Sequence, residues 1–241
     1  MNIDIEWPDM ALKKGLEIAN EVSNSDLYVF DIGAHHGETF STFYNCLGGN
    51  FKYSGFEPDP ETYKTLLNNV KGFDTEARDI SAEYFNEAVG PSLAQMDFYR
   101  TSASAVSGLL KPEGELDNRV PAGDHNIQDI IKVNVNTIDN VIEANGHVNF
   151  LKIDTEGFDL ECLKGASRSL LDNKIDVVMC ETFFVKYRVG QAYFWDIAKY
   201  LEEHGYYFVN IYDARDTGQG RLYTANGIWV SNTVAKSLDY L

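Results

Sequence analysis

The stretch Tyr28-Val-Phe-Asp-Ile-Gly-Ala-His-His-Gly37 joins a short apolar run to a glycine turn and then to a helical pattern. A run of this length predicts a strand over residues 27–32 that is buried on both faces. A second run at 51–56 repeats the pattern, and helical spacing follows the two runs over 38–47 and 60–70. Strands and helices that alternate at this spacing form parallel βαβ units. The sequence therefore predicts an α/β fold with a doubly wound, mostly parallel sheet.

The remaining chain continues this alternation. Apolar patterns predict strands over 82–89, 95–100, 131–135, 148–153 and 175–180, and helices over 137–144, 159–171 and 192–203. Two late runs, 206–212 and 227–231, are typical of an antiparallel pair that closes the sheet. Pro8 and the apolar spacing after it predict an N-terminal helix that ends near residues 23–24. We expect an N-terminal helical extension over residues 1–26 and a single domain over 27–241.

Residues 101–130 differ from the rest of the chain. They contain Ser, Gly, Pro and charged residues with little periodicity. A stretch of this length inside a compact domain is usually functional or mobile. We therefore expect a lid or acceptor-binding loop at 101–130.

Composition and charge restrict the partners. The chain has 241 residues, 44% hydrophobic and 13% aromatic, which is enough for a sizeable core. Twenty Lys and Arg stand against 37 Asp and Glu, and the net charge is −17. Nucleic-acid binders neutralise phosphates with clustered basic residues, and no basic run occurs here. We expect a neutral or cationic small molecule or a neutral sugar as partner, and neither a nucleic acid nor an acidic membrane surface.

Three widely spaced cysteines, Cys46, Cys162 and Cys180, lack a Cys-x-x-Cys pair. This argues against a disulfide framework and against a zinc site built on cysteine. The first ten residues do not resemble a signal peptide, and no apolar run approaches the length of a membrane span. The pattern predicts a reducing, cytoplasmic location.

The glycine turn is spaced differently from a dinucleotide-binding loop. Gly33 and Gly37 lie four residues apart, not in the G-x-G-x-x-G spacing that diphosphates require. Asp31, at the end of the first strand, would repel a phosphate and suits a ligand with an ammonium group, such as the methionine part of S-adenosylmethionine. Glu57 ends the second strand, near the ~20-residue offset of a ribose-binding acid. The alternative is an ordinary strand-turn-helix with an N-capping acid and a surface glutamate.

A second acidic cluster occurs in Phe150-Leu-Lys-Ile-Asp-Thr-Glu-Gly157. If the chain stays extended after the strand, Asp154 and Glu156 face one side of the sheet. Gly157 would then turn the chain, and Glu181 at the end of the next strand would lie alongside. Three carboxylates in one crevice can hold a metal, orient hydroxyls or supply a general base, and crowding raises their pKa values. The alternative is helix capping, with Glu181 exposed.

Taken together, these motifs resemble those of the FkbM-type methyltransferases. The matching segments, in order, are Asp31 to Ala34, Glu57 to Pro60, Glu87-Ala-Val-Gly90, Ser107-Gly-Leu109, Lys152 to Gly157 and Leu163 to Ala166. The similarity covers roughly residues 28–183, and the ordered set is far more specific than any one motif. Two departures stand out: His35-His36 replaces the asparagine common after the alanine, and Asp159 replaces a frequent glutamate.

The resemblance implies a class I (Rossmann-like) methyltransferase that binds S-adenosylmethionine and methylates a hydroxyl of a sugar, polysaccharide or small natural product. The cofactor contacts that we predict are Asp31, Gly33, Ala34, His35, Gly37, Glu57, Pro58, Glu87, Ala88, Ser107 and Asp154. For removal of the hydroxyl proton we predict Asp154 as the base or orienting group, with Glu156, Glu181 and His35 behind it. A divalent metal is possible but is not assigned.

Three other functions stay open. A nicotinamide oxidoreductase shares this sheet, but Asp31 and the missing third glycine argue against it. An RNA methyltransferase requires a basic groove, and a non-catalytic interaction protein would bind no S-adenosylmethionine. Neither the acceptor nor the oligomeric state follows from the sequence.

Overall fold

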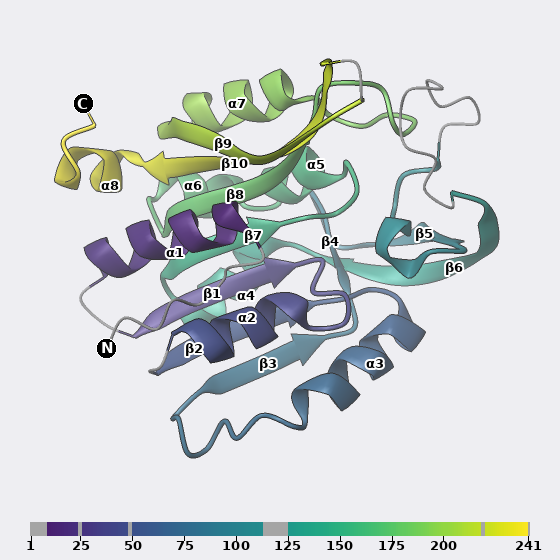
Figure 1. Ribbon diagram of the computed structural model, residues 1–241, viewed down its shortest axis with the longest axis horizontal. Coiled ribbons are helices and arrows are strands. Elements are labelled where there is room, and N and C mark those ends of the chain that lie inside the picture. Colours follow the sequence, from purple (N-terminus) through teal and green to yellow (C-terminus); the bar gives the residue numbers. More distant parts are fainter. Residues whose placement is uncertain (1–8, 24–25, 48–49, 113–124, 218–219, 241) are drawn as a thin grey trace.

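The computed structural model describes residues 9–23, 26–47, 50–112, 125–217 and 220–240. Its large sheet has seven strands in the order β3-β2-β1-β7-β8-β10-β9 (Figure 1). The strands are β1 (Leu27–Ile32), β2 (Phe51–Phe56), β3 (Ser81–Phe85), β7 (Val148–Ile153), β8 (Ile175–Phe183), β9 (Tyr206–Asp216) and β10 (Leu222–Ser231). Strands β3, β2, β1, β7 and β8 pair in parallel, and β10 is antiparallel to both β8 and β9. The predicted doubly wound sheet with an antiparallel closing strand is confirmed.

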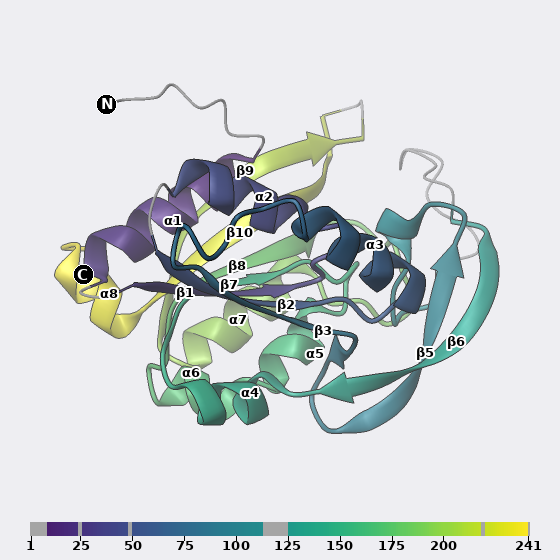
Figure 2. The ribbon, with the colours of Figure 1, turned by 90° about the horizontal axis from the view of Figure 1, so that it is seen from below.

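Helices cover both faces of this sheet (Figure 2). On one face lie α1 (Met10–Val22), α2 (Glu38–Cys46) and α3 (Pro60–Val70); on the other lie α4 (Ile138–Asn145), α5 (Asp159–Lys164), α6 (Ser167–Leu171) and α7 (Phe194–Glu203). Every residue of β1 and β7 is buried, because successive side chains point to opposite layers. Phe30 and Leu151 pack on the α4–α7 side, whereas Val29 and Phe150 pack with α1 and α2. A last helix, α8 (Asn232–Ser237), packs on β8, β9 and β10 and belongs to the same core as α1. These two cores hold the carboxyl ends of β1, β2 and β7 in one row.

A second sheet has three strands in the order β4-β6-β5. It consists of β4 (Ala88–Val89), β5 (Ala94–Thr101) and β6 (Ile127–Asn136), and β5 leads into the 3₁₀ helix η1 (Ser104–Val106). The single strand predicted over 82–89 is wrong, because β3 and β4 belong to different sheets. The amide of Asn86, between them, donates to the backbone carbonyls of Glu57 and Pro58. These two hydrogen bonds stabilise the turn where the chain leaves the large sheet.

The helix predicted over 159–171 is also wrong in one respect, since it is divided into α5 and α6. The division falls at Gly165, where a Cβ would lie 2.1 Å from the backbone oxygen of Gly90. This close contact requires glycine, which has the weakest helix propensity after proline.

At the N-terminus, α1 begins at Met10 with Asp9 as its N-cap, and Asp9 accepts a hydrogen bond from the Leu12 N–H. Pro8, the predicted first residue of this helix, lies outside the described residues. Within the described part of the predicted loop at 101–130, η1 and the start of β6 are regular, and residues 113–124 lie outside the description. The division into an extension over 1–26 and a domain over 27–241 stays a prediction. Among the described helices, none has the length and apolar character needed to cross a membrane.

Candidate functional site

A cavity of about 350 Å³ opens at the carboxyl ends of β1, β2 and β7. This is within the range of small-molecule pockets. We call two of its sides the strand-tip wall (Gly33, Ala34, Glu57, Pro58, Glu87 and Ala88) and the turn wall (Asp154, Thr155 and Glu156). The rest of the lining includes residues of β5, of η1 and of the segment that follows η1, namely Phe98, Ser104, Ala105, Ser107, Gly108 and Leu109. The two predicted acidic segments therefore do face one cavity.

The two walls meet at Gly33. Its φ is +85°, and a Cβ there would lie 2.0 Å from the backbone oxygen of Asp154. The N–H groups of Gly33 and Ala34 both donate to the Phe56 carbonyl, at 3.0 and 2.9 Å, so the turn is fixed to the end of β2. Only glycine satisfies both the left-handed backbone and the contact with Asp154.

Glu57 is a buried carboxylate on the strand-tip wall, 6% exposed. Its two oxygens accept hydrogen bonds from the backbone N–H groups of Asp59 (2.8 Å) and His35 (3.2 Å). Burial raises the pKa of Glu57 to about 7, although the Asp59 N–H opposes this. A carboxylate held in this way keeps lone pairs for donors in the cavity, such as the hydroxyls of a ribose.

Asp31 does not face the cavity as predicted. It is fully buried beneath the turn, where it accepts hydrogen bonds from Tyr53 and, at 2.9 Å, from the ammonium group of Lys152. The Lys152 ammonium also donates to the Gly33 carbonyl at 3.2 Å and lies 3.8 Å from the Asp154 carboxylate. Burial lowers the pKa of Lys152, but the charges of Asp31 and Asp154 raise it, and the net direction is upward. The charge of Asp31 is thus balanced inside the protein.

Lys152 lines the cavity and is not among the predicted site residues. A signal was available, since a lysine inside a mostly apolar run that is predicted to be buried on both faces must have an anionic partner.

The three carboxylates of the second acidic cluster do lie together. One oxygen from each of Asp154, Glu156 and Glu181 lies within 4.8 Å of the others. The predicted reason is wrong, however, because β7 ends at Ile153 and the chain is not extended beyond it. Glu156 has φ +58° and Gly157 has φ +92°, so a left-handed turn brings Glu156 beside Asp154.

The three carboxylates differ in their ion pairs, their pKa values and their exposure. Glu156 pairs with Arg188 at 2.8 Å, and burial raises the pKa of Glu156 to about 7 against the charge of Arg188. Burial and then the charges of Asp154 and Glu156 raise the pKa of Glu181 well above its ordinary value. Crowding of the carboxylates raises these pKa values, as predicted, but burial is the larger cause of the increase. Asp154 is the accessible member, with its side chain 44% exposed.

Arg188 links three segments of the site and was not predicted. It is 1% exposed and donates to the backbone oxygens of Val106 (2.5 Å) and Leu110 (3.3 Å) as well as to Glu156. It lies in the loop between β8 and α7, in which no pattern marked it. Its contacts fix the turn wall against the segment after η1.

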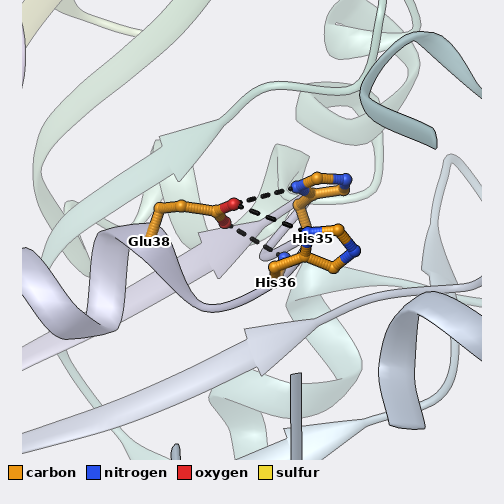
Figure 3. A group of neighbouring side chains, drawn as sticks. All are labelled: His35, His36 and Glu38. Atoms are coloured by element: carbon orange, nitrogen blue, oxygen red, sulfur yellow. Dashed lines mark hydrogen bonds and ion pairs between the residues drawn. The ribbon is translucent and has the colours of Figure 1, made fainter. Parts of the chain in front are cut away.

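His35, His36 and Glu38 form a group at the start of α2 (Figure 3). The His35 Nδ1 lies 3.2 Å from the Glu38 carboxylate, and its Nε2 lies 2.9 Å from the Ser104 hydroxyl across the cavity. Burial lowers the pKa of His35, whereas its bond to Glu38 raises it, and the net direction is upward. His35 and Glu38 both line the cavity.

Most predicted site residues line the cavity: Gly33, Ala34, His35, Glu57, Pro58, Glu87, Ala88, Ser107, Asp154 and Glu156. Asp31, Gly37 and Glu181 do not. Gly37 is the N-cap of α2 with φ +91°, and a Cβ there would lie 2.9 Å from Leu66 on α3. Its glycine is explained by the turn and by helix packing.

Comparisons with known proteins agree with this geometry. The profile of the methyltransferase FkbM domain matches residues 31–208. The methyltransferase FkbM from Methylobacillus flagellatus KT is similar with a TM-score of 0.55 and 18% identity, over 87% of this chain and 45% of that one. The magnesium protoporphyrin IX methyltransferase ChlM from Synechocystis PCC 6803, in a structure with bound SAM, is similar with a TM-score of 0.50 and 8% identity, over 92% and 78%.

These likenesses show the fold, a class I methyltransferase sheet with its helices. This chain spans less than half the length of the Methylobacillus protein. A search of curated proteins gives no match.

Proposed function

The chain belongs to the FkbM methyltransferase family, and we propose that it transfers the methyl group of S-adenosylmethionine to a hydroxyl of a carbohydrate or small natural product. The observation that carries the proposal is one cavity with a buried carboxylate, Glu57, on the strand-tip wall and an accessible one, Asp154, on the turn wall.

The residues of the cavity fit the cofactor. Gly33 lines the cavity and lets the strand-tip wall pack directly against the Asp154 backbone, a contact that any Cβ would block. Glu57 would accept hydrogen bonds from the ribose hydroxyls, and the apolar side chains of Phe98 and Leu109 offer surface for a flat base.

The cofactor supplies the reactivity, a methyl group on a positively charged sulfur. The protein has to position the acceptor oxygen, exclude water and take up the hydroxyl proton. Asp154 is the best placed of the candidate bases, because Glu156 is paired with Arg188 and Glu181 does not line the cavity. General-base assistance of this kind contributes about 10²–10⁴-fold in rate.

A neutral, hydroxyl-rich acceptor fits the charge of the chain. The net charge of −17 disfavours a polyanion. Ser104, Ser107 and Thr155 add hydroxyl groups to the lining, and such groups can donate to and accept from sugar hydroxyls.

Calorimetry with S-adenosylmethionine and S-adenosylhomocysteine tests the cofactor assignment. We expect one site per chain, and the affinity of Glu57→Ala to fall at least about tenfold, which corresponds to loss of about 1.4 kcal/mol. Glu61→Ala, which alters a carboxylate of α3 away from the cavity lining, is the matched control and should bind as the wild type does. Absence of binding by the wild type would reject the proposal, and unchanged affinity in Glu57→Ala would reject the ribose assignment.

A further inference from the structure

The group formed by His35, His36 and Glu38 stands where the sequence departs from the pattern it otherwise resembles. One ligand atom from each residue lies within 4.8 Å of the other two. The Glu38 oxygen lies 3.2 Å from Nδ1 of His35 and 3.8 Å from Nδ1 of His36. Figure 3 shows the carboxylate directed at both histidines.

We propose that His35, His36 and Glu38 bind a divalent transition-metal ion of borderline softness, such as Zn²⁺, on the rim of the cavity. Two imidazoles and a carboxylate are a donor set that such ions accept, with bonds of about 2.0–2.2 Å. Tetrahedral bonds of that length place neighbouring donor atoms about 3.3 Å apart, which is close to the 3.2 and 3.8 Å between the Glu38 oxygen and the two imidazole nitrogens. The fourth position is left for water or for an oxygen of a ligand.

The surroundings of the group are those of a ligand shell. A metal-bound histidine usually gives its second ring nitrogen to a hydrogen bond that fixes its orientation. Nε2 of His35 has such a partner in the Ser104 hydroxyl at 2.9 Å, which leaves Nδ1 directed at Glu38. The second Glu38 oxygen accepts the backbone N–H of His36 at 3.0 Å, so the carboxylate is oriented as well.

An ion can reach this group. The side chains of His35, His36 and Glu38 are 26%, 35% and 64% exposed, and the chain is strongly anionic. The two imidazoles are stacked with their centroids 3.8 Å apart and tilted by 33°. To direct both lone pairs at one ion, the half-exposed His36 ring turns out of this stack.

A Co²⁺ titration followed by visible absorption tests the site without any methyl donor or acceptor. We expect a saturable spectrum of tetrahedral type with one ion per chain, displaced by Zn²⁺. His36→Ala and Glu38→Gln should each weaken binding at least about tenfold. His147→Ala is the matched control, because His147 is an exposed histidine paired with a carboxylate, Asp176, at 2.8 Å; it should bind as the wild type does.

Chemical modification of the wild type with diethyl pyrocarbonate gives a second readout that requires no variant. Zn²⁺ should protect the peptide that contains His35 and His36 and leave the modification of His147 unchanged. Either the lack of a saturable spectrum or equal binding by His36→Ala and the wild type would overturn the proposal. These measurements do not depend on cofactor binding, so their outcome is distinct from that of the proposed function.

Discussion

The two walls of the cavity are built in different ways. The strand-tip wall follows from the main chain, because Gly33 and Glu57 come directly after β1 and β2, which pair in register. The turn wall depends on a left-handed residue, Glu156, and on Arg188, which lies 32 positions further along the chain. Carboxyl ends of parallel strands lie at one edge of a sheet, whereas a turn is fixed only by its contacts.

The carboxylates of the two walls also have different partners. Glu57 accepts hydrogen bonds from backbone N–H groups, whereas Glu156 forms an ion pair with a buried guanidinium. Asp154, between them, stays accessible, with the Lys152 ammonium 3.8 Å away. In the function that we propose, the strand-tip wall therefore binds the cofactor and Asp154 on the turn wall takes up the proton.

The largest effect is expected from Asp154→Asn, which keeps the shape of the turn wall and removes its accessible carboxylate. Turnover should fall by about 10²–10⁴-fold, as for loss of a general base. Affinity for S-adenosylhomocysteine should change by less than about threefold, well under 1.4 kcal/mol. Single-turnover kinetics and calorimetry measure the two quantities. An equal loss of both would move Asp154 to the cofactor contacts and remove the distinction between the walls.

Lys152→Met breaks the link between the walls. It leaves Asp31 buried without a cation and the Gly33 carbonyl without its donor. Breaking a buried ion pair costs about 3–5 kcal/mol, a large fraction of a typical stability of about 5–15 kcal/mol. Urea unfolding measures this cost.

The control is Lys132→Met, since Lys132 pairs with Asp97 at 2.8 Å on the surface, where the side chains are 64% and 48% exposed. Such pairs are worth about 0–1 kcal/mol. In the double variant Asp31→Asn/Lys152→Met, part of the lost stability should return. If the two single lysine variants were equally stable, the buried link would have no structural role.

Gly33→Ala tests the contact at which the walls meet. A Cβ 2.0 Å from the Asp154 backbone oxygen, at φ +85°, must displace the turn. Overpacking adds about 1–3 kcal/mol to the strain of a left-handed residue, about 1–2 kcal/mol, so we expect a loss of about 2–5 kcal/mol.

Gly205→Ala separates these contributions, because Gly205 has φ +80° but no atom within 4 Å of an added Cβ. Thermal unfolding should show only the strain in this variant. Equal losses in the two variants would mean that the close contact between the walls contributes nothing.

The same contrast explains what could be predicted from the sequence. Strands β1, β2 and β7 and helix α3 have the predicted bounds, because buried runs and a Pro60 helix start are local signals. Glu57 was placed by counting residues from Gly33, since a βαβ unit has nearly fixed geometry.

The turn wall could not be derived in this way. The left-handed conformation of Glu156 is unusual for a residue with a Cβ, and it is stabilised by Arg188, a contact that no local pattern encodes. The prediction that Asp31 contacts the ligand rests on its place at the end of a strand, and nothing local shows that Lys152, 121 residues away in the chain, pairs with it. Ion pairs between residues this far apart in the chain cannot be predicted until the fold is known.

Glu181→Gln is expected to have the smallest effect, and it sharpens the contrast with Asp154. Burial and the neighbouring carboxylates raise the pKa of Glu181, which favours its neutral form, the form that glutamine resembles. The folded protein holds this proton more tightly than the unfolded chain does. The contribution of Glu181 to stability is therefore complete below its ordinary pKa of about 4.3 and is lost as the pH rises towards its folded value. The variant should match the wild type within about 0.5 kcal/mol at pH 4 and become the more stable of the two as the pH rises above 5, as measured by urea unfolding. Turnover should remain close to that of the wild type at pH 7. A variant that lost stability with rising pH relative to the wild type would show that Glu181 is ionised, and the base could then no longer be assigned to Asp154 alone.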